Sequence, residues 1–320
     1  MLKRIENKVR NIYKKLEHPQ NLPKIFSGER YIYSIKEGID IIAKSILSQD
    51  PILISRYGTT ELSIIEYFIK NRKKWSCSFP DNLKQNISIL SGFYPATDDF
   101  LCRFSCEALS IFNNIDILGV RSRVNERDFY EIEDIFINNY TTSATLIDIC
   151  SLSPLNINYI PWMRCLKGKK VLVIHPFSDT IYNQYQKRKE IFEKQEIFLP
   201  DFTLLLCKAV QTLQGSPDRN MFLNWFEALQ FMEKEICSYD FDIALIGAGA
   251  YGMFLGNYIK NIGKKAIHIG GALQLLFGIK GKRWDISTEI TKFYNDAWVY
   301  PCEKDKYNGY RLVEGGCYYE

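Results

Sequence analysis

A chain of 320 residues is long enough for one large α/β domain or two small domains, and it can bury a full hydrophobic core. Hydrophobic residues make up 46% and charged residues 24% of the chain, which excludes a disordered protein, a collagen and a coiled-coil rod. The formal net charge of +4 is too small a surplus to indicate a nucleic-acid-binding protein.

The first 17 residues differ from the rest of the chain in charge. They contain six basic and two acidic side chains, so this segment alone accounts for the net charge of +4. Apolar residues recur in it at steps of three and four, which predicts an amphipathic helix: Leu2, Ile5, Val9, Ile12 and Leu16. Such a helix can lie on an anionic membrane surface, pair with its copy in a homodimer, or dock on its own domain.

The sequence gives little sign of export. No apolar signal-peptide core follows Met1–Glu6, and no stretch approaches the roughly 20 apolar residues that span a bilayer. The nine cysteines are odd in number and show no zinc-site spacing, so we expect reduced thiols. We therefore expect a cytoplasmic protein, either free or peripheral at the inner face of the plasma membrane.

Helical spacing of apolar residues alternates with short apolar runs along most of the chain. The sequence predicts helices over residues 1–17, 34–48, 59–70, 100–112, 126–138, 178–192, 219–238 and 250–262. It predicts strands over residues 51–55, 116–120, 145–150, 171–174, 242–246 and 265–269, and leaves residues 202–206 ambiguous. Residues 285–320 are rich in aromatic side chains and show little periodicity.

Strands that alternate with helices predict crossover connections, and hence an α/β fold with a mostly parallel sheet and helices on both faces. The strands are continuous apolar runs, as a Rossmann-like sheet covered on both sides requires. We expect three parts: an N-terminal helical extension (1–48), an α/β catalytic domain (49–284) and a C-terminal segment that wraps the domain (285–320).

In open parallel sheets, ligands bind beyond the carboxyl ends of the strands, so the residues that follow each strand are candidates for the site. The first such turn runs from Ser55 to Glu61. Gly58 and Thr59 open a helix there, Arg56 supplies a cation suited to phosphate, and Glu61 lies in the first helical turn. A purely structural alternative has Glu61 completing the helix cap and pairing with Arg56.

The second turn, Gly247–Gly252, matches G-x-G-x-x-G between a strand and a helix and contains Gly249 and Tyr251. Its glycines would let a phosphate approach the backbone. The acidic residue that NAD-binding proteins carry roughly 20 positions later is missing, since the next strand ends in His268. The turn therefore favours a nucleotide diphosphate over NAD, and close packing without a ligand is the alternative.

Two further turns add candidates. After His268, Gly270 and Gly271 open another helix, and a cationic cluster that includes Lys282 and Arg283 follows. After residues 171–174, His175 ends a strand at a turn that leads into a helix. We expect both histidines to reach the cleft as candidate catalytic residues beside Glu61, although a histidine at a strand end also serves as a structural residue.

Two of these segments resemble one family. The turn Arg56-Tyr-Gly-Thr-Thr-Glu61 resembles the Arg-Phe-Gly-Asp-Gly-Glu turn of bacterial glycosyltransferases with the GT-D fold. Residues 246–255 and 263–270 are similar to that family's glycine turn, helix and Gly-x-x-Ala-Ile-Asp-Ile-Gly strand. The resemblance covers about residues 45–285 and is specific at its two ends.

The resemblance implies transfer of a sugar from a nucleotide sugar, in particular a UDP-sugar, to a glycan or lipid-linked glycan acceptor. The products would be bacterial surface polysaccharide or glycoprotein. In the family an Asp-x-Glu pair helps to hold a divalent metal, whereas this chain has Thr59-Thr60-Glu61. One carboxylate is a poor site for Mg²⁺ or Mn²⁺, so we expect no metal site here, with Glu61 the ligand if one is used.

Three roles remain open for Glu61: the base that deprotonates the acceptor, a contact to a donor-sugar hydroxyl, or the one protein ligand of a metal. Fixed cations and helix N-termini would then stabilise the leaving diphosphate. Two other functions also remain open. One is an NAD-linked oxidoreductase that uses the G-x-G-x-x-G turn, and the other is a non-catalytic nucleotide-binding assembly protein.

Overall fold

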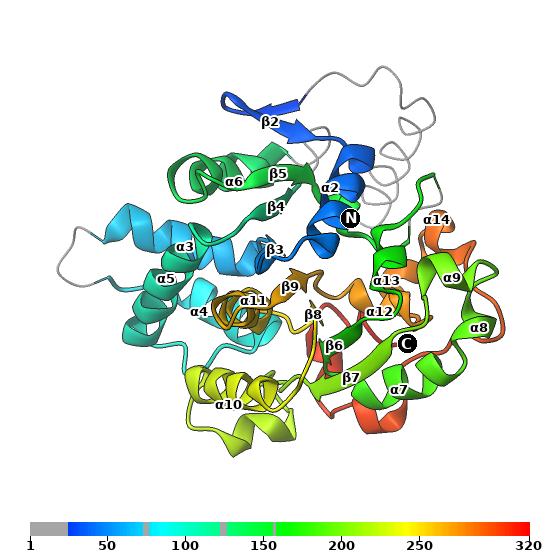
Figure 1. Cartoon of the computed structure of the whole chain (residues 1–320). Coiled ribbons are helices and arrows are strands. Elements are labelled where there is room, and N and C mark those ends of the chain that lie inside the picture. Colours follow the sequence, from blue (N-terminus) through cyan, green and yellow to red (C-terminus); the bar gives the residue numbers. More distant parts are fainter. Residues whose placement is uncertain (1–24, 73–76, 122–126, 156–157) are drawn as a thin grey trace.

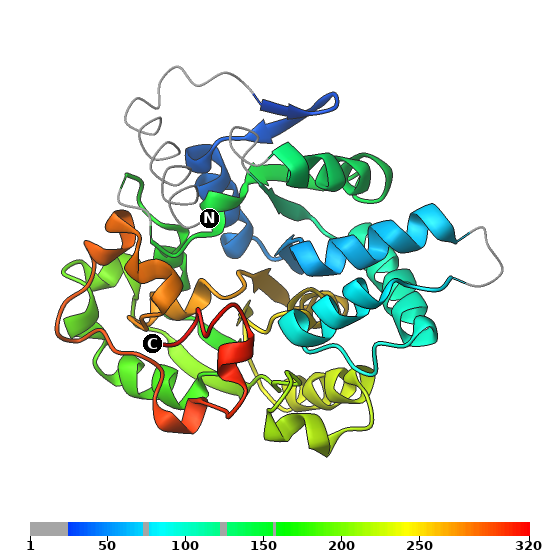
Figure 2. The same ribbon diagram turned by 180° about the vertical axis from the view of Figure 1, so that it is seen from behind.

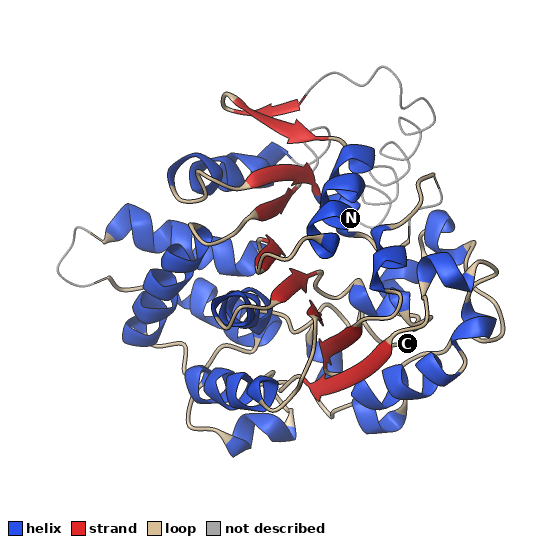
Figure 3. Ribbon diagram, viewed as in Figure 1, coloured by secondary structure: helices blue, strands red, loops and turns tan. Residues whose placement is uncertain are grey.

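One nine-stranded sheet runs through the part of the chain that the computed structural model describes, which is residues 25–72, 77–121, 127–155 and 158–320 (Figure 3). Its strand order is β1-β2-β5-β4-β3-β9-β8-β6-β7, and all neighbours are parallel except β1 and β2. The strands are β1 (Ile25–Ser27), β2 (Arg30–Tyr33), β3 (Ile52–Arg56), β4 (Ile117–Val120), β5 (Thr145–Asp148), β6 (Lys170–His175), β7 (Thr203–Lys208), β8 (Ile243–Ile246) and β9 (Lys265–His268).

Helices cover both faces of the sheet (Figure 1). One face packs against α3 (Thr59–Asn71), α4 (Asp81–Ser91), α5 (Asp98–Phe112), α6 (Arg127–Asn139), α10 (Trp225–Cys237) and α11 (Tyr251–Asn261). The other face packs against α2 (Ile35–Leu47), α7 (Ser178–Gln186), α8 (Arg188–Ile191), α12 (Leu273–Leu276) and α13 (Lys282–Asp285). Two short helices, α9 (Gln195–Phe198) and α14 (Thr288–Thr291), complete the set of α-helices in the described ranges. The predicted α/β fold with helices on both faces is confirmed.

The strands are continuous apolar runs because their side chains enter two cores. In β6, Leu172 and Ile174 belong to the core on the α11 side, and Val171 and Val173 belong to the core on the α2 side. All four are fully buried, and each such burial stabilises the fold by about 1.5–3 kcal/mol.

The sheet has two halves that meet at its centre. Residues 25–148 supply β1 to β5, residues 170–268 supply β6 to β9, and β3 pairs with β9 through Ile54 and Ile267. At this junction β3, an early strand of the chain, lies beside β9, its last strand. Because these strands are parallel, their carboxyl ends lie at one edge of the sheet, and the loops that follow them position the site.

The described structure corrects the N-terminal boundary. Residues 35–47 form the predicted helix as α2, which begins with a capping box between Ser34 and Glu37. Residues 25–33, however, form β1 and β2, and these strands belong to the central sheet. Residues 25–47 are therefore part of the α/β domain and not of a separate helical extension. The predicted helix over residues 1–17 lies outside the described residues.

Three other elements differ from expectation. The predicted helix over residues 178–192 is interrupted at Lys187 between α7 and α8. The helix predicted over residues 219–238 begins only at Trp225, because the side chain of Asn224 caps it there by accepting a hydrogen bond from the Glu227 amide. The ambiguous run at residues 202–206 lies mostly in the edge strand β7.

The last residues of the chain return across the molecule. Figure 2 shows this segment in red on the near side of the sheet. Tyr307, Val313 and Tyr318 line the same crevice as the strand ends, so the C-terminal segment forms part of its wall. Within the described ranges, no helix combines the length and apolar character needed to cross a membrane.

Candidate functional site

The carboxyl ends of β3, β6, β8 and β9 bring four predicted site residues into contact. A Cβ atom at Gly270 would lie 2.5 Å from Nη2 of Arg56. A Cβ atom at Gly247 would lie 2.5 Å from Cδ2 of His175 and 3.0 Å from the carbonyl oxygen of Gly270. The loops that follow Arg56 and Gly247 are distant in sequence, and they adjoin each other across the β9 loop.

The first loop leads directly into α3 and leaves Glu61 without a partner. The helix begins at Thr59 with Gly58 as its N-cap, and no side chain caps it. The Glu61 carboxylate folds back over Gly58, where an added Cβ would lie 1.9 Å from Oε2. In the described structure Glu61 has no hydrogen bond or ion pair. The structural alternative, in which Glu61 completes the cap and pairs with Arg56, is therefore wrong.

Three guanidinium groups line the same cleft as this carboxylate. Burial lowers the pKa of Arg56, and the positive charges of Arg121 and Arg283 lower it further. The interactions of Arg56 with Tyr318 and Glu61 act in the opposite direction and raise its pKa. Since electrostatic effects of this kind fall off with distance, the three cations lie in one site with Glu61. Such a concentration of positive charge suits a ligand with several negative charges.

Two of these cations are held by neighbouring side chains. Arg121 follows β4, donates a hydrogen bond to the Thr59 hydroxyl and pairs with the buried Glu133, with 3.2 Å between Nε and Oε1. Arg283 donates a 2.7 Å hydrogen bond to the hydroxyl of Tyr318. Both guanidinium groups are thus oriented before any ligand arrives.

A cleft of about 440 Å³ contains these groups. Its lining includes Arg56, Gly58, Thr59, Glu61, Arg121, Gly249, His268, Arg283, Glu314 and Tyr318. The β3, β4, β8 and β9 ends and the C-terminal segment all contribute. A second compartment of about 150 Å³ adjoins it, and the two share Arg56, Gly249 and Tyr318 among their linings.

The glycines of the G-x-G-x-x-G turn divide into two kinds. The space beside Gly247 is filled by the ring of His175, and a Cβ at Gly252 would lie 2.3 Å from Nε2 of His268. Those two glycines make room for the protein's own imidazoles. Gly249 differs, because it has a φ of +54° and nothing within 4 Å of an added Cβ. Gly249 is the glycine of this turn that leaves open space for a ligand.

The backbone of the same turn is only partly available. The amides of Tyr251 and Gly252 donate 3.1 Å hydrogen bonds to the carbonyl oxygens of Ala248 and Gly249. The amides of Gly249 and Ala250 find no acceptor in the described part of the chain, and they precede α11. Unpaired amides at a helix N-terminus favour an anion.

Both candidate histidines are buried. Their exposed fractions are 3% for His175 and 4% for His268, and burial lowers the pKa of each to about 3. His175 accepts a 3.0 Å hydrogen bond at Nδ1 from the Phe177 amide, so its proton resides on Nε2. His268 shares a 3.1 Å hydrogen bond with Ser55. Neutral, buried imidazoles position the loops and hold hydrogen bonds, and neither is set to exchange protons near pH 7.

Three other predicted site residues, Tyr251, Gly271 and Lys282, contribute little or nothing to the cleft, each for its own reason. Tyr251 stacks on Trp225, with ring centroids 4.5 Å apart, and its hydroxyl meets Thr212 at 2.6 Å, so its ring belongs mainly to the core. The space beside Gly271 is filled by the Tyr318 ring. Lys282 is exposed and does not line either compartment.

The residues of the cleft do not suit a divalent metal. Among the residues that the structure describes, Glu61 and Glu314 are the two carboxylates in its lining, and three arginines share the same space. Among the described residues there is no group of three or more histidine, cysteine, aspartate or glutamate side chains able to hold a metal ion. Mg²⁺ and Mn²⁺ prefer several oxygen ligands, which this arrangement does not supply.

Sequence reasoning missed two residues of the site. Arg121 directly follows β4, so the rule that selected Arg56 applies to it equally. Tyr318 had no such signal, because it is brought to the cleft by the fold of an aperiodic segment.

No protein-family model matches the sequence, and no curated protein matches it either. Among solved structures, the chain is similar to a selenomethionine-substituted structure of domain of unknown function 1792, with 15% identity over 77% of this chain and 80% of that one, and a TM-score of 0.42. It is also similar to a structure described as this highly conserved domain having a distinct glycosyltransferase fold, with 14% identity over 76% and 79% of the two chains and a TM-score of 0.42. A third, described as a new glycosyltransferase (DUF1792) from Streptococcus sanguinis, has 10% identity over 75% and 82% of the two chains and a TM-score of 0.37. These values describe a remote likeness between the chains and no more.

Proposed function

We propose that this protein is a glycosyltransferase that moves a sugar from a nucleotide-sugar donor, a UDP-sugar, to the hydroxyl of a glycan acceptor. The observation that carries the proposal is the unpaired carboxylate of Glu61 in a cleft with three arginines. The resemblance of residues 56–61, 246–255 and 263–270 to GT-D glycosyltransferases supports the same assignment.

The arrangement suits each part of the transfer reaction. The bond between sugar C1 and the phosphate oxygen breaks, and the diphosphate leaves with the electron pair. Arg56, Arg283 and the free amides of Gly249 and Ala250 would stabilise that charge without rearranging. The acceptor oxygen forms the new bond to C1, and its proton passes to Glu61 as general base. General-base catalysis of this kind contributes roughly 10²–10⁴ in rate.

An NAD-linked oxidoreductase has less support. In dinucleotide-binding folds an acidic side chain at the end of the second strand binds the ribose. Here that position is His268, which is buried against Gly252 and hydrogen-bonded to Ser55. The assembly-protein alternative predicts nucleotide binding without sugar transfer by the wild-type protein.

The wider role follows from the same proposal. The acceptor would be a growing or lipid-linked glycan in bacterial surface-polysaccharide or glycoprotein synthesis. The basic residues 1–17 would bring the enzyme to the inner face of the plasma membrane or join two copies as a homodimer.

The test is a transfer assay over a panel of nucleotide sugars with wild-type protein and the Glu61→Gln variant. We expect transfer by the wild type and a loss of at least about a hundred-fold in kcat for the variant. Glu66→Gln is the matched control, since Glu66 lies on the same helix and pairs with Lys70 at the surface. Equal transfer by wild type and Glu61→Gln would refute the assignment of the base.

A further inference from the structure

The second compartment of the cleft differs in chemistry from the first. Its wall is largely aromatic and apolar, with Phe177, Tyr307, Tyr310, Tyr318 and Tyr319 among the lining residues. The first compartment instead contains Arg121, Arg283 and Glu61, and it shares Arg56 with the second. A single ligand that spans both would be charged at one end and flat and apolar at the other.

Tyr318 stands where the two compartments meet. It lines both, and its ring occupies the space beside Gly271, where an added Cβ would lie 2.1 Å from Cε1. On the cationic side its hydroxyl accepts the hydrogen bond from Arg283, whose guanidinium lies 5.0 Å from the ring centroid. The ring is therefore fixed in place between the apolar and the charged parts.

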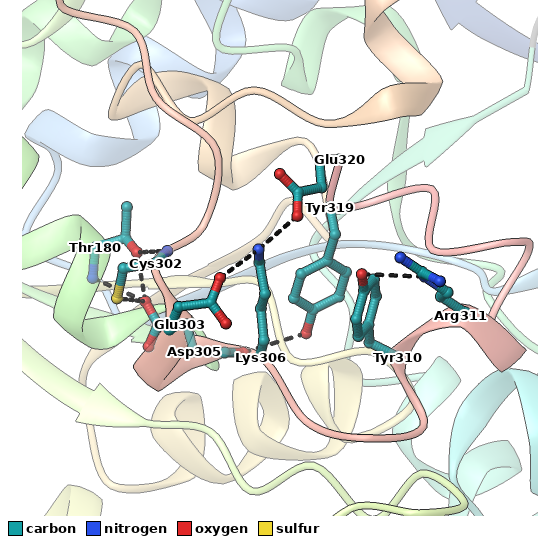
Figure 4. Close-up of polar contacts among 9 residues, drawn as sticks. All are labelled: Thr180, Cys302, Glu303, Asp305, Lys306, Tyr310, Arg311, Tyr319 and Glu320. Carbon is teal, nitrogen blue, oxygen red and sulfur yellow. Dashed lines mark hydrogen bonds and ion pairs between the residues drawn. The ribbon is translucent and has the colours of Figure 1, made fainter.

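The segment that supplies these tyrosines is anchored to the body of the protein (Figure 4). Asp305 accepts hydrogen bonds of 2.8 and 2.5 Å from the amide and hydroxyl of Thr180, at the start of α7. Lys306 pairs with Glu303 at 2.8 Å and with the last residue, Glu320, at 2.7 Å. The compartment is thus preformed, which reduces the entropy cost of binding.

Polar atoms without partners occur in the same wall. Gln274 is fully buried and donates through Nε2 to the carbonyl oxygens of Lys280 and Tyr318, which leaves Oε1 without a partner. The hydroxyl of Tyr307 also lacks one. Both atoms are closed off from solvent, so they are exceptions to the rule that buried polar atoms are satisfied, and the wall offers a ligand its aromatic rings instead.

We propose that the aromatic compartment binds the nucleobase of the donor, stacked against Tyr318, while the diphosphate lies over Gly249 toward Arg56. This inference rests on the proposed function, which supplies the nucleotide. A planar base matches the tyrosine rings and the largely apolar wall of this compartment. The C-terminal segment then determines which nucleotide the enzyme accepts.

The test compares dissociation constants for UDP and for inorganic pyrophosphate by titration calorimetry on the full-length chain. Pyrophosphate reports on the cationic compartment alone, so the ratio of the two constants isolates the contribution of the nucleoside. In Tyr318→Ala we expect the affinity for UDP to fall about ten-fold relative to the affinity for pyrophosphate, as for the loss of one base–aromatic stack. Tyr318→Phe keeps the ring and should retain the wild-type ratio.

A second variant protects the test against a folding defect. Val313 lines both compartments, and Val313→Trp would fill the space for the base without removing any anchor. It should shift the ratio in the same direction. Tyr182→Ala, at a side chain that is 56% exposed outside the cleft, should leave the ratio unchanged.

The outcomes separate the two proposals. An unchanged ratio in both Tyr318→Ala and Val313→Trp, or a wild type that binds UDP no better than pyrophosphate, would overturn the base site. Sugar transfer by the wild type together with an unchanged ratio would overturn the base site and leave the proposed function intact. A shifted ratio in a protein that transfers no sugar would support the base site and contradict the proposed function.

Discussion

The guanidinium group of Arg56 occupies the space that a side chain at Gly270 would need. A Cβ there would lie 2.5 Å from Nη2 and 2.8 Å from Nε of the arginine, closer than atoms in contact can approach. Arg56 ends β3 and Gly270 follows β9, so this contact joins the two halves of the sheet where β3 pairs with β9. Position 270 therefore requires glycine, because any side chain there would collide with the Arg56 guanidinium group.

Replacing Gly270 by alanine should therefore displace Arg56. Gly270 has a φ of +78°, so the substitution also strains the backbone, at a cost of about 1–3 kcal/mol. Gly263→Ala is the matched control, with a φ of +82° and nothing within 4 Å of the added Cβ. We expect similar losses of unfolding free energy from strain in both, and loss of pyrophosphate binding in Gly270→Ala alone. Equal pyrophosphate affinity in the two variants would contradict the role of the glycine.

The two buried histidines should make stability depend on pH. Their folded pKa of about 3 lies below the unfolded value of about 6.5, so the unfolded chain takes up protons first as the pH falls. Their contribution is complete above about pH 6.5 and is lost between that pH and about 3. Well below pH 6.5 each histidine should lower the unfolding free energy by about 1.4 kcal/mol per pH unit.

Urea unfolding at pH 7, 6 and 5 measures this slope. His268→Asn should remove the share of one histidine, and comparison with the wild type cancels the contribution of the other titrating groups. If the two proteins show the same slope over this range, His268 is not buried in its neutral form.

Transfer should not require a divalent metal. The two carboxylates in the cleft lining share it with three arginines, which supply the positive charge that a metal would otherwise bring. We expect the rate of sugar transfer to be unchanged by EDTA and by added Mg²⁺ or Mn²⁺. A loss of activity in EDTA that Mn²⁺ restores would show that Glu61 holds a metal.

The basic segment at residues 1–17 should bind anionic lipid. Its deletion is expected to weaken sedimentation with liposomes that contain phosphatidylserine, and the effect should fade as salt is raised, because charge attraction is screened. Unchanged sedimentation of the truncated protein would remove the membrane part of the proposal and leave the catalytic part untouched.

The central strands were predictable because two-sided burial leaves a local trace. Val171–Ile174 and Ile243–Ile246 are uninterrupted apolar runs, and only a sheet covered on both faces needs them. Strand β1 left no such trace, since it has three residues and lies at the sheet edge, and β2 left none because Ile32 is the one buried residue of its four. Helix α4 was missed for a similar reason, because Ile87 is its one fully buried side chain.

The site residues likewise divide into those that the sequence predicts and those that only the fold reveals. Arg56 and Gly249 were found because they follow strands, and the topology places all such residues at one edge of the sheet. The match at Gly247 and Gly252 was misleading in part, because only the fold shows that His175 and His268 fill the space beside them. Tyr318 depends on the return of the C-terminal segment, and no spacing in the sequence encodes where an aperiodic segment goes.

The most direct measurement is the affinity for inorganic pyrophosphate in wild type, Arg56→Gln and Gly249→Ala, with Gly263→Ala as the control for backbone strain. If the loops that follow β3 and β8 hold one diphosphate between them, the wild type and Gly263→Ala should bind it, and Arg56→Gln and Gly249→Ala should each lose at least about ten-fold in affinity, as for the loss of a charge-assisted contact. Wild-type affinity in either Arg56→Gln or Gly249→Ala would show that the loops do not share a ligand.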